Sequence, residues 1–194
     1  MKHLNFLNSM LSICIPVYQF LIEDLVTSLH EQAQKISVEF EILVIDDCSD
    51  ISFQEQNRSV CEKLNIIYEE LPSNFGRSKI RNYFLSKVIH DFLLFIDCDM
   101  KIINNQFLVN YIQTIEKENS KLVVCGGLAY EEKKPFDEYL LRWKYGHFRE
   151  VRSVSERVKN PNHSFMSSNF LISKSLLTSL KFDESLTQYG HEDT

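Results

Sequence analysis

The amino-acid sequence predicts an α/β protein with a mostly parallel sheet and helices on both faces. Several short apolar runs have no polar face, which is typical of strands buried on both sides. Segments with helical spacing alternate with these runs. The chain has 194 residues, 44% of them hydrophobic, and its five glycines and four prolines mark no long linker. We therefore expect one domain over residues 1–194.

The first half of the chain contains two predicted strand–helix units. The run "MLSICIPVY" is the first buried strand, closed by Pro16, and apolar residues then recur at helical spacing from Leu21 to Ile36. The run "FEILVIDD" is the second strand, and a polar helical segment follows from about Ser52 to Leu64. Short apolar runs separated by longer periodic segments favour parallel pairing with helical crossovers.

The second half continues the same alternation. "NIIYEE" is the third strand, and "SNFGRSKIRNYFLSKVIH" reads as a loop that opens a helix. "DFLLFID" is the fourth strand, followed by a helix through "NQFLVNYIQTIEKE", and "KLVVCGGLAY" (121–130) is the fifth strand. In such sheets a ligand binds beyond the carboxyl ends of the strands.

Composition narrows the class of protein. The net charge of −6 argues against nucleic-acid binding, because no excess of positive charge is present to neutralise phosphates. The five cysteines are scattered and contain no C-x-x-C pair, which favours a reducing, cytoplasmic compartment over a disulfide framework or a zinc site. We find no signal-peptide pattern at the start and no apolar run of about 18 residues that could cross a membrane.

Two pairs of aspartates follow buried strands. Asp46 and Asp47 end the second strand, while Asp97 and Asp99 end the fourth. Two carboxylates held close together repel each other unless a proton or a cation such as Mg²⁺ or Mn²⁺ lies between them. Ordinary explanations stay open at this point: Asp99 as a helix cap, Asp97 as a solvated loop residue, and the 46–47 pair as turn residues that satisfy loop amides.

Basic residues open the helix after the third strand. Arg77 and Arg81 are one helical turn apart, so they can share a face, and guanidinium groups suit an anionic ligand. Lys79 between them is better explained as part of an exposed cationic face. The sequence contains neither G-x-G-x-x-G nor G-x-x-x-x-G-K-[ST], so neither a dinucleotide fingerprint nor a P-loop is supported.

Two further segments have both a functional and an ordinary explanation. Glu192 and Asp193 are adjacent near the last residue and could simply be a solvated acidic tail. Residues 142–159 carry six basic and two acidic residues beside Trp143, Tyr145 and Phe148. This composition suits an anionic or lipid-linked acceptor near a membrane surface, and an ordinary solvated helix and loop explains it equally well.

Read in order, the motifs resemble family 2 of the glycosyltransferases, the inverting nucleotide-sugar enzymes with the GT-A fold. The matching segments cover nearly the whole chain. They are "LSICIPVYQ", "ILVIDDCSD", "NFGRSKIRN", "LLFIDCDM", "FMSSNFLISKSLLTSLKFDESL" and "YGHEDT". The resemblance implies a metal-dependent hexosyl- or N-acetylhexosaminyltransferase that uses Mn²⁺ or Mg²⁺. It further implies a nucleotide-sugar donor, by default a UDP-sugar, and a saccharide or lipid-linked saccharide acceptor in polysaccharide biosynthesis.

The resemblance also assigns roles to residues. Tyr18 and the backbone around Pro16 would cradle the base, and one of Asp46 and Asp47 would bind the base or ribose. Asp97 would hold the ribose or donor sugar and contribute to the metal site, and Asp99 would ligate the metal that bridges the diphosphate. Asp193 would be the catalytic base and Glu192 would help to bind the acceptor. Arg77 or Arg81 would assist the leaving group.

Several departures and rival classes accompany this resemblance. Lys79 and Ile80 stand where small residues are usual, and Cys98 inside the D-x-D motif is unusual. Because related enzymes continue past the closing motif, we expect a catalytic domain truncated at its C-terminus. A sugar nucleotidyltransferase is a rival, although its glycine-rich opening loop is missing, and a haloacid-dehalogenase phosphatase is a weaker one. A non-catalytic nucleotide-binding scaffold of the same fold is the third alternative. We also expect a cytoplasmic location, with peripheral association at the inner face of the membrane.

Overall fold

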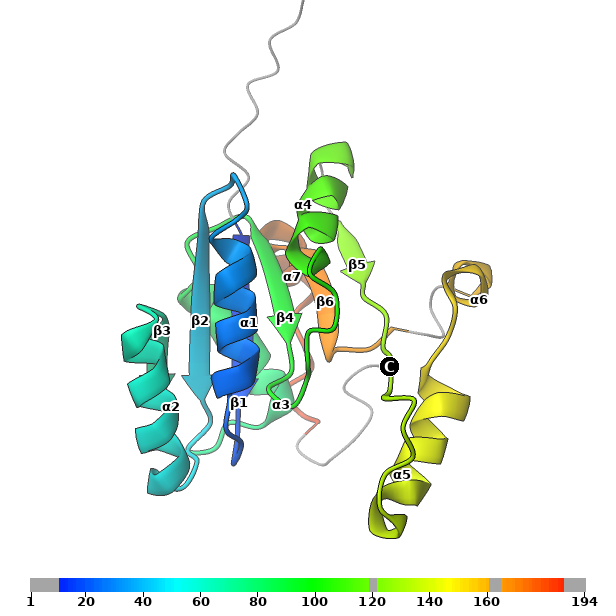
Figure 1. Cartoon of the computed structure of the whole chain (residues 1–194). Helices are drawn as coiled ribbons and strands as arrows, with labels where there is room; N and C mark the ends of the chain where they lie inside the picture. Colours follow the sequence, from blue (N-terminus) through cyan, green and yellow to red (C-terminus); the bar gives the residue numbers. More distant parts are fainter. Residues whose placement is uncertain (1–10, 119–121, 161–164, 187–194) are drawn as a thin grey trace, which may run out of the picture.

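The computed structural model describes residues 11–118, 122–160 and 165–186. In this part of the chain six strands form one sheet in the order β3-β2-β1-β4-β6-β5 (Figure 1). The strands are β1 (Leu11–Val17), β2 (Phe40–Asp46), β3 (Ile67–Glu70), β4 (Phe92–Ile96), β5 (Val123–Cys125) and β6 (Asn169–Ser173). The carboxyl-terminal ends of the parallel strands β1, β2, β3 and β4 define the edge at which a ligand site is expected.

The sheet is mostly parallel, as the sequence predicts. β1 pairs in parallel with β2 and with β4, and β2 pairs in parallel with β3. β6 runs antiparallel to both of its neighbours, β4 and β5. β5 therefore does not pair with β4, because β6, which comes later in the chain, lies between β4 and β5.

Helices cover both faces of the sheet (Figure 1). One face packs against α1 (Glu23–Ala33), α2 (Ile51–Lys63) and α4 (Phe107–Glu118). The other face packs against α3 (Arg77–Tyr83), the 3-10 turn η1 (Phe84–Ser86) and α7 (Lys174–Leu180). Two apolar clusters result, one on each side of the sheet.

The strands β1, β2, β4 and β6 are largely apolar because each supplies side chains to both clusters. In β4, Leu94 and Ile96 lie in the cluster with α1 and α4, while Leu93 and Phe95 lie in the cluster with α3 and α7. Phe95 stacks on Phe170 of β6 with ring centroids 5.0 Å apart. This two-sided burial is the physical reason why the strand runs lack a polar face.

The fifth strand is shorter than predicted. We expected a strand over residues 121–130, but β5 ends at Cys125. The carbonyls of Cys125 and Gly126 accept hydrogen bonds from the Arg157 guanidinium at 2.8 and 3.0 Å. The two carbonyl groups are thus hydrogen-bonded although the chain has left the sheet. Residues 126–131 follow outside the sheet and line the cavities described below.

A smaller helical lobe lies beside the sheet, next to β5 (Figure 1). It contains the 3-10 turn η2 (Asp137–Tyr139), α5 (Leu140–Tyr145), the π-helical turn η3 (Gly146–Glu150) and α6 (Val154–Lys159). None of the five cysteines forms a disulfide. Across residues 11–118, 122–160 and 165–186, we find no helix with the length and apolarity needed to cross a bilayer.

Candidate active site

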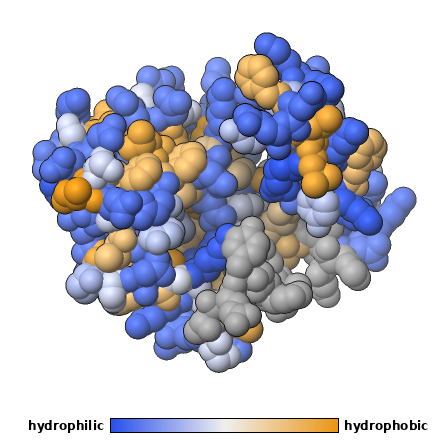
Figure 2. All heavy atoms as spheres, turned by 90° about the horizontal axis from the view of Figure 1, so that it is seen from below, coloured by the Kyte–Doolittle hydropathy of each residue, from blue (hydrophilic) through white to orange (hydrophobic). Residues whose placement is uncertain are grey.

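A cavity of about 380 Å³ lies at the carboxyl ends of β1, β2 and β4. Figure 2 views the molecule onto this edge, where hydrophilic residues lie in the hollow between the sheet and the helical lobe. Every predicted site residue within the described segments lines the cavity except Asp46. These residues are Pro16, Tyr18, Asp47, Arg77, Arg81, Asp97 and Asp99.

Asp47 connects the end of β2 to the loop before α3. Its Oδ1 accepts a hydrogen bond from the Phe75 N–H at 2.6 Å, and its Oδ2 accepts one from the Gly76 N–H at 2.9 Å. The Asn74 side-chain amide donates to the Asp47 carbonyl at 3.1 Å. Burial raises the pKa of the Asp47 carboxyl, and the two backbone hydrogen bonds oppose that rise. Asp47 therefore fixes the loop that forms one wall of the cavity.

Asp46, its neighbour, has no exposed surface and does not line the cavity. Its Oδ1 accepts from the Ser49 N–H at 2.6 Å, and its Oδ2 accepts from the Tyr68 hydroxyl at 3.1 Å. This is the turn-forming role that the sequence left open for the pair. Of the two aspartates, Asp47 is the one that faces the candidate site.

The two arginines share one helical face at the cavity. Arg81 is only 3% exposed, and its Nη2 donates to Asp97 Oδ1 at 2.8 Å. Its Nη1 donates to the carbonyl of Arg77, which is itself exposed at the cavity. Gly76 precedes the helix with φ 76° and ψ 172°, a conformation that favours glycine. Lys79 is exposed, is absent from the cavity wall, and sits over the Phe75 ring at 4.0 Å.

The D-x-D segment turns sharply after β4. The Asp97 N–H donates to the Ser168 carbonyl at 2.9 Å, and the Met100 N–H donates to the Asp97 carbonyl at 3.1 Å. Cys98 packs against the apolar core, and burial raises the pKa of its thiol to about 11. Asp99 is exposed. The unusual cysteine thus acts as a small apolar residue and leaves both carboxylates at the cavity.

Asp97 and Asp99 are the candidate metal ligands. Within the described segments no group of three His, Cys, Asp or Glu side chains is arranged to hold a metal ion. Mg²⁺ is commonly held by one or two carboxylates together with substrate phosphates and waters. Two carboxylates at a cavity that also contains Arg77 and Arg81 fit a cation whose coordination is completed by a diphosphate.

A second cavity of about 630 Å³ adjoins the first. Both share Arg77, Asp97 and Asp99. Its far wall comes from residues 128–131, from the helical lobe and from residues 166–168. The sequence predicts a binding role for 142–159 from its aromatic and basic composition, and Ser168 belongs to the family-like segment 165–186 without an assigned role. It gives no signal for Tyr130, which has no motif of its own.

Glu150 organises the far wall of this second cavity. It accepts hydrogen bonds from the Tyr130 hydroxyl and, at 2.7 Å, from Arg142 Nη1. Burial raises the pKa of Glu150, but these hydrogen bonds and the Arg142 charge outweigh that effect and lower it overall. Burial and the bond to Glu150 raise the pKa of Tyr130 to about 12. A Cβ on Gly146 would overlap the Tyr130 ring, so the π-helical turn needs glycine there.

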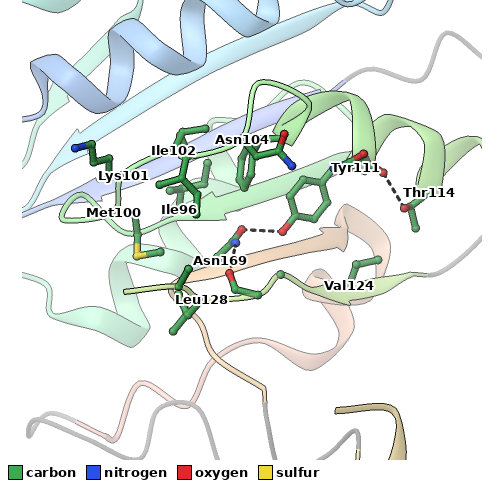
Figure 3. A pocket seen from close by; sticks show the side chains of 16 residues that line it. Ile96, Met100, Lys101, Ile102, Asn104, Tyr111, Thr114, Val124, Leu128 and Asn169 are labelled. Atoms are coloured by element: carbon green, nitrogen blue, oxygen red, sulfur yellow. Dashed lines mark hydrogen bonds between the residues drawn. The ribbon is translucent and has the colours of Figure 1, made fainter. Parts of the chain in front are cut away.

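A third, mostly apolar pocket of about 440 Å³ lies between α4, the loop after β4 and residues 126–129 (Figure 3). The Tyr111 hydroxyl donates to Asn169 Oδ1 at 2.7 Å, and Asn169 Nδ2 donates to the Gly127 carbonyl. These buried polar groups are thereby satisfied, and the remaining wall is largely aliphatic. The pocket joins the second cavity through shared lining residues: Met100, Lys101, Ile103, Leu128 and Ala129.

The predicted catalytic pair, Glu192 and Asp193, lies outside the residues that the structure describes. The remaining predicted residues converge from β1, β2, α3 and β4 on one cavity, apart from Asp46. The fold and the site together define an α/β domain of the GT-A type, with its ligand cavity beyond the carboxyl ends of the parallel strands.

The chain belongs to glycosyl transferase family 2, because the model of that family matches residues 12–180. It is similar to the poly(ribitol-phosphate) beta-N-acetylglucosaminyltransferase TarS of Staphylococcus aureus strains Mu50 and MW2, with 31% identity over 116 residues. The match covers 58% of this chain and 20% of TarS, so the chain spans about a fifth of these curated relatives.

Solved structures confirm the GT-A fold. A structure of S. aureus TarS 1-349 in complex with UDP has a TM-score of 0.62 and 24% identity, covering 94% of this chain and 52% of that chain. A Pyrobaculum calidifontis mannosyltransferase in complex with GDP-Man and Mn²⁺ has a TM-score of 0.60 and 18% identity, covering 90% of this chain and 47% of that chain.

Proposed function

We propose that this chain is the donor-binding part of a metal-dependent inverting glycosyltransferase that uses a UDP-sugar. The observation that carries the proposal is the convergence of Asp47, Arg81, Asp97 and Asp99 on one cavity at the carboxyl ends of the parallel strands. Similar proteins solved as complexes with UDP and with UDP-GlcNAc favour uridine as the base. Two solved structures with Mn²⁺ favour that ion or Mg²⁺.

In this proposal the donor lies across the first cavity. Tyr18 and the backbone at Pro16 cradle the base, and Asp47 accepts a hydrogen bond from the base or ribose. Asp97, oriented by Arg81, holds the ribose or donor sugar. Arg77 stabilises the negative charge that develops on the departing diphosphate. Asp99, with Asp97, would hold a divalent cation, which when bound supplies further charge stabilisation to the leaving group.

The second cavity is the proposed acceptor side. An inverting transfer requires a base that takes the proton of the acceptor hydroxyl while its oxygen attacks the anomeric carbon from the face opposite the leaving group. Asp193 is the proposed base, by resemblance to the family, with Glu192 assisting the acceptor. The acceptor is a saccharide or a lipid-linked saccharide. The apolar pocket that joins this cavity (Figure 3) favours an acceptor with an apolar portion.

Calorimetric titration of UDP with and without Mn²⁺ tests the donor half of the proposal. We expect binding that Mn²⁺ strengthens, and we expect Asp99→Asn to lose that enhancement while keeping the thermal stability of the wild type. Asp137→Asn is the matched control, because its carboxylate is 91% exposed and lies away from both cavities. Absence of UDP binding under both conditions would overturn the donor half of the proposal. An unchanged Mn²⁺ effect in Asp99→Asn would remove the metal role.

A further inference from the structure

The outer face of α5 and the following π-helical turn exposes large apolar side chains. Leu141 and Phe148 are each 81% exposed, and Tyr145 is 56% exposed. Their spacing of four and then three residues places them on one side of the helix. Figure 2 shows hydrophobic side chains at the surface of the lobe to the right, which contains this helix. We call Leu141, Tyr145 and Phe148 the apolar face.

The opposite side of the same helix is polar and holds the lobe together. Trp143 Nε1 donates to the Glu131 carbonyl at 2.7 Å, and the His147 ring lies 3.2 Å from the same oxygen. Arg142 and Glu150 pair with each other and line the second cavity. Large apolar side chains therefore face outward on this helix, whereas Trp143, His147 and Glu150 face the lobe, which is unusual for a surface helix.

Exposed cations flank the apolar face. Lys144 lies between Leu141 and Tyr145 in the chain, and Arg149 and Arg152 follow Phe148; all three are exposed. The chain as a whole carries a net charge of −6, and the acidic Asp137 and Glu138 are exposed just before Leu141, so the positive charge is concentrated at Lys144 and on the Phe148 side of the face. Aromatic and aliphatic side chains beside Lys and Arg are typical of helices that lie in the interface of an anionic bilayer.

We propose that the apolar face, with Lys144, Arg149 and Arg152, docks this domain onto a membrane that contains anionic lipid. An exposed apolar strip alone would suit a protein partner or a second copy of the chain equally well. The flanking positive charge selects the bilayer, because an overall acidic second copy offers no comparable sheet of negative headgroups. Docking here would hold the second cavity, whose wall is the inner side of the same helix, beside the membrane surface. This last point rests on the proposed function, whereas the docking itself does not.

Co-sedimentation with vesicles tests the docking without any nucleotide or sugar. The full chain is mixed with vesicles of phosphatidylcholine alone, or with one-third phosphatidylglycerol. We expect binding to the anionic vesicles that weakens as salt is added. Leu141→Ser with Phe148→Ser should abolish it. Replacing Lys144, Arg149 and Arg152 by glutamine should weaken it about a hundredfold, since each cation near an anionic surface contributes about fivefold.

The matched control is Ile89→Ser with Leu180→Ser, two apolar residues that are 73% and 65% exposed outside the helical lobe. This variant should bind the vesicles like the wild type. Circular dichroism of each variant verifies that it is folded. Failure of the wild type to sediment with anionic vesicles, or equal loss in the control, would overturn the proposal. A dimer in light scattering that Leu141→Ser with Phe148→Ser dissociates, without vesicle binding, would assign the face to a second copy instead.

Discussion

Replacing Asp47 by asparagine should destabilise the fold far more than the same change at Asp46. Both side chains are buried and each carboxylate accepts two hydrogen bonds, so the chemical change is matched. The partners differ. Both partners of Asp47 are backbone N–H groups, which only donate. One of them must then face the new NH₂ group, whichever way the amide is turned.

At position 46 the amide can satisfy both partners. Its oxygen keeps the Ser49 N–H, and its NH₂ group donates to the Tyr68 hydroxyl, which can also accept. We expect a cost of about 1 kcal/mol from weaker, uncharged hydrogen bonds. At position 47 the unpaired N–H costs about 1–3 kcal/mol and the weakened second bond about 1 kcal/mol more.

The difference of about 2 kcal/mol corresponds to a melting temperature about 4–8 °C lower for Asp47→Asn than for Asp46→Asn in a chain of this size. Differential scanning calorimetry measures it. Because Asp47 holds Phe75 and Gly76 at the cavity wall, titration of UDP should also show weaker binding for this variant only. Equal destabilisation of both variants, or greater loss in Asp46→Asn, would refute the reasoning from donor and acceptor roles.

Three further changes test the framework around the site. Gly126→Ala should lower the free energy of unfolding by about 1–3 kcal/mol, because its Cβ would overlap the buried, hydrogen-bonded amide of Asn169. Gly127→Ala is the control, since its Cβ lies 3.5 Å from the nearest atom. Similar urea midpoints for the two variants would contradict this prediction. Gly76→Ala should lower the free energy of unfolding by about 1–3 kcal/mol through backbone strain, although no atom lies within 4 Å of the new methyl group. An unchanged melting temperature in calorimetry would count against this prediction. Glu150 has a pKa below its ordinary 4.5 in the folded state, so its contribution to stability is present above pH 4.5 and is lost as the pH falls through the lowered value. The stability gap between wild type and Glu150→Gln should therefore shrink in urea titrations below that pH, and a constant gap would disprove the ionic role.

The parallel part of the sheet could be predicted because burial on both faces leaves a run of apolar residues within the strand itself. Leu93 to Ile96 are apolar without alternation since both faces of β4 are covered, and such a run is recognisable without knowing its neighbours. The position of β6 between β4 and β5 could not be predicted in this way. Strand order depends on contacts between residues far apart in the chain, and no local pattern in Asn169–Ser173 specifies its antiparallel partners.

The candidate site shows the same division between local and long-range information. Parallel strands end at one edge, so Asp47, Asp97 and Asp99 had to lie near one another once the strands were recognised. Spacing could not decide which of Asp46 and Asp47 faces the cavity. That choice depends on distant partners, because Tyr68 of β3 binds Asp46 and the loop before α3 binds Asp47. The D-x-D segment is simpler. Cys98 packs against the apolar core, and Asp97 and Asp99 on either side of it both line the cavity. In this chain the spaced pair Asp97 and Asp99 therefore shares the cavity, whereas the adjacent pair Asp46 and Asp47 is divided between a buried turn and the cavity wall.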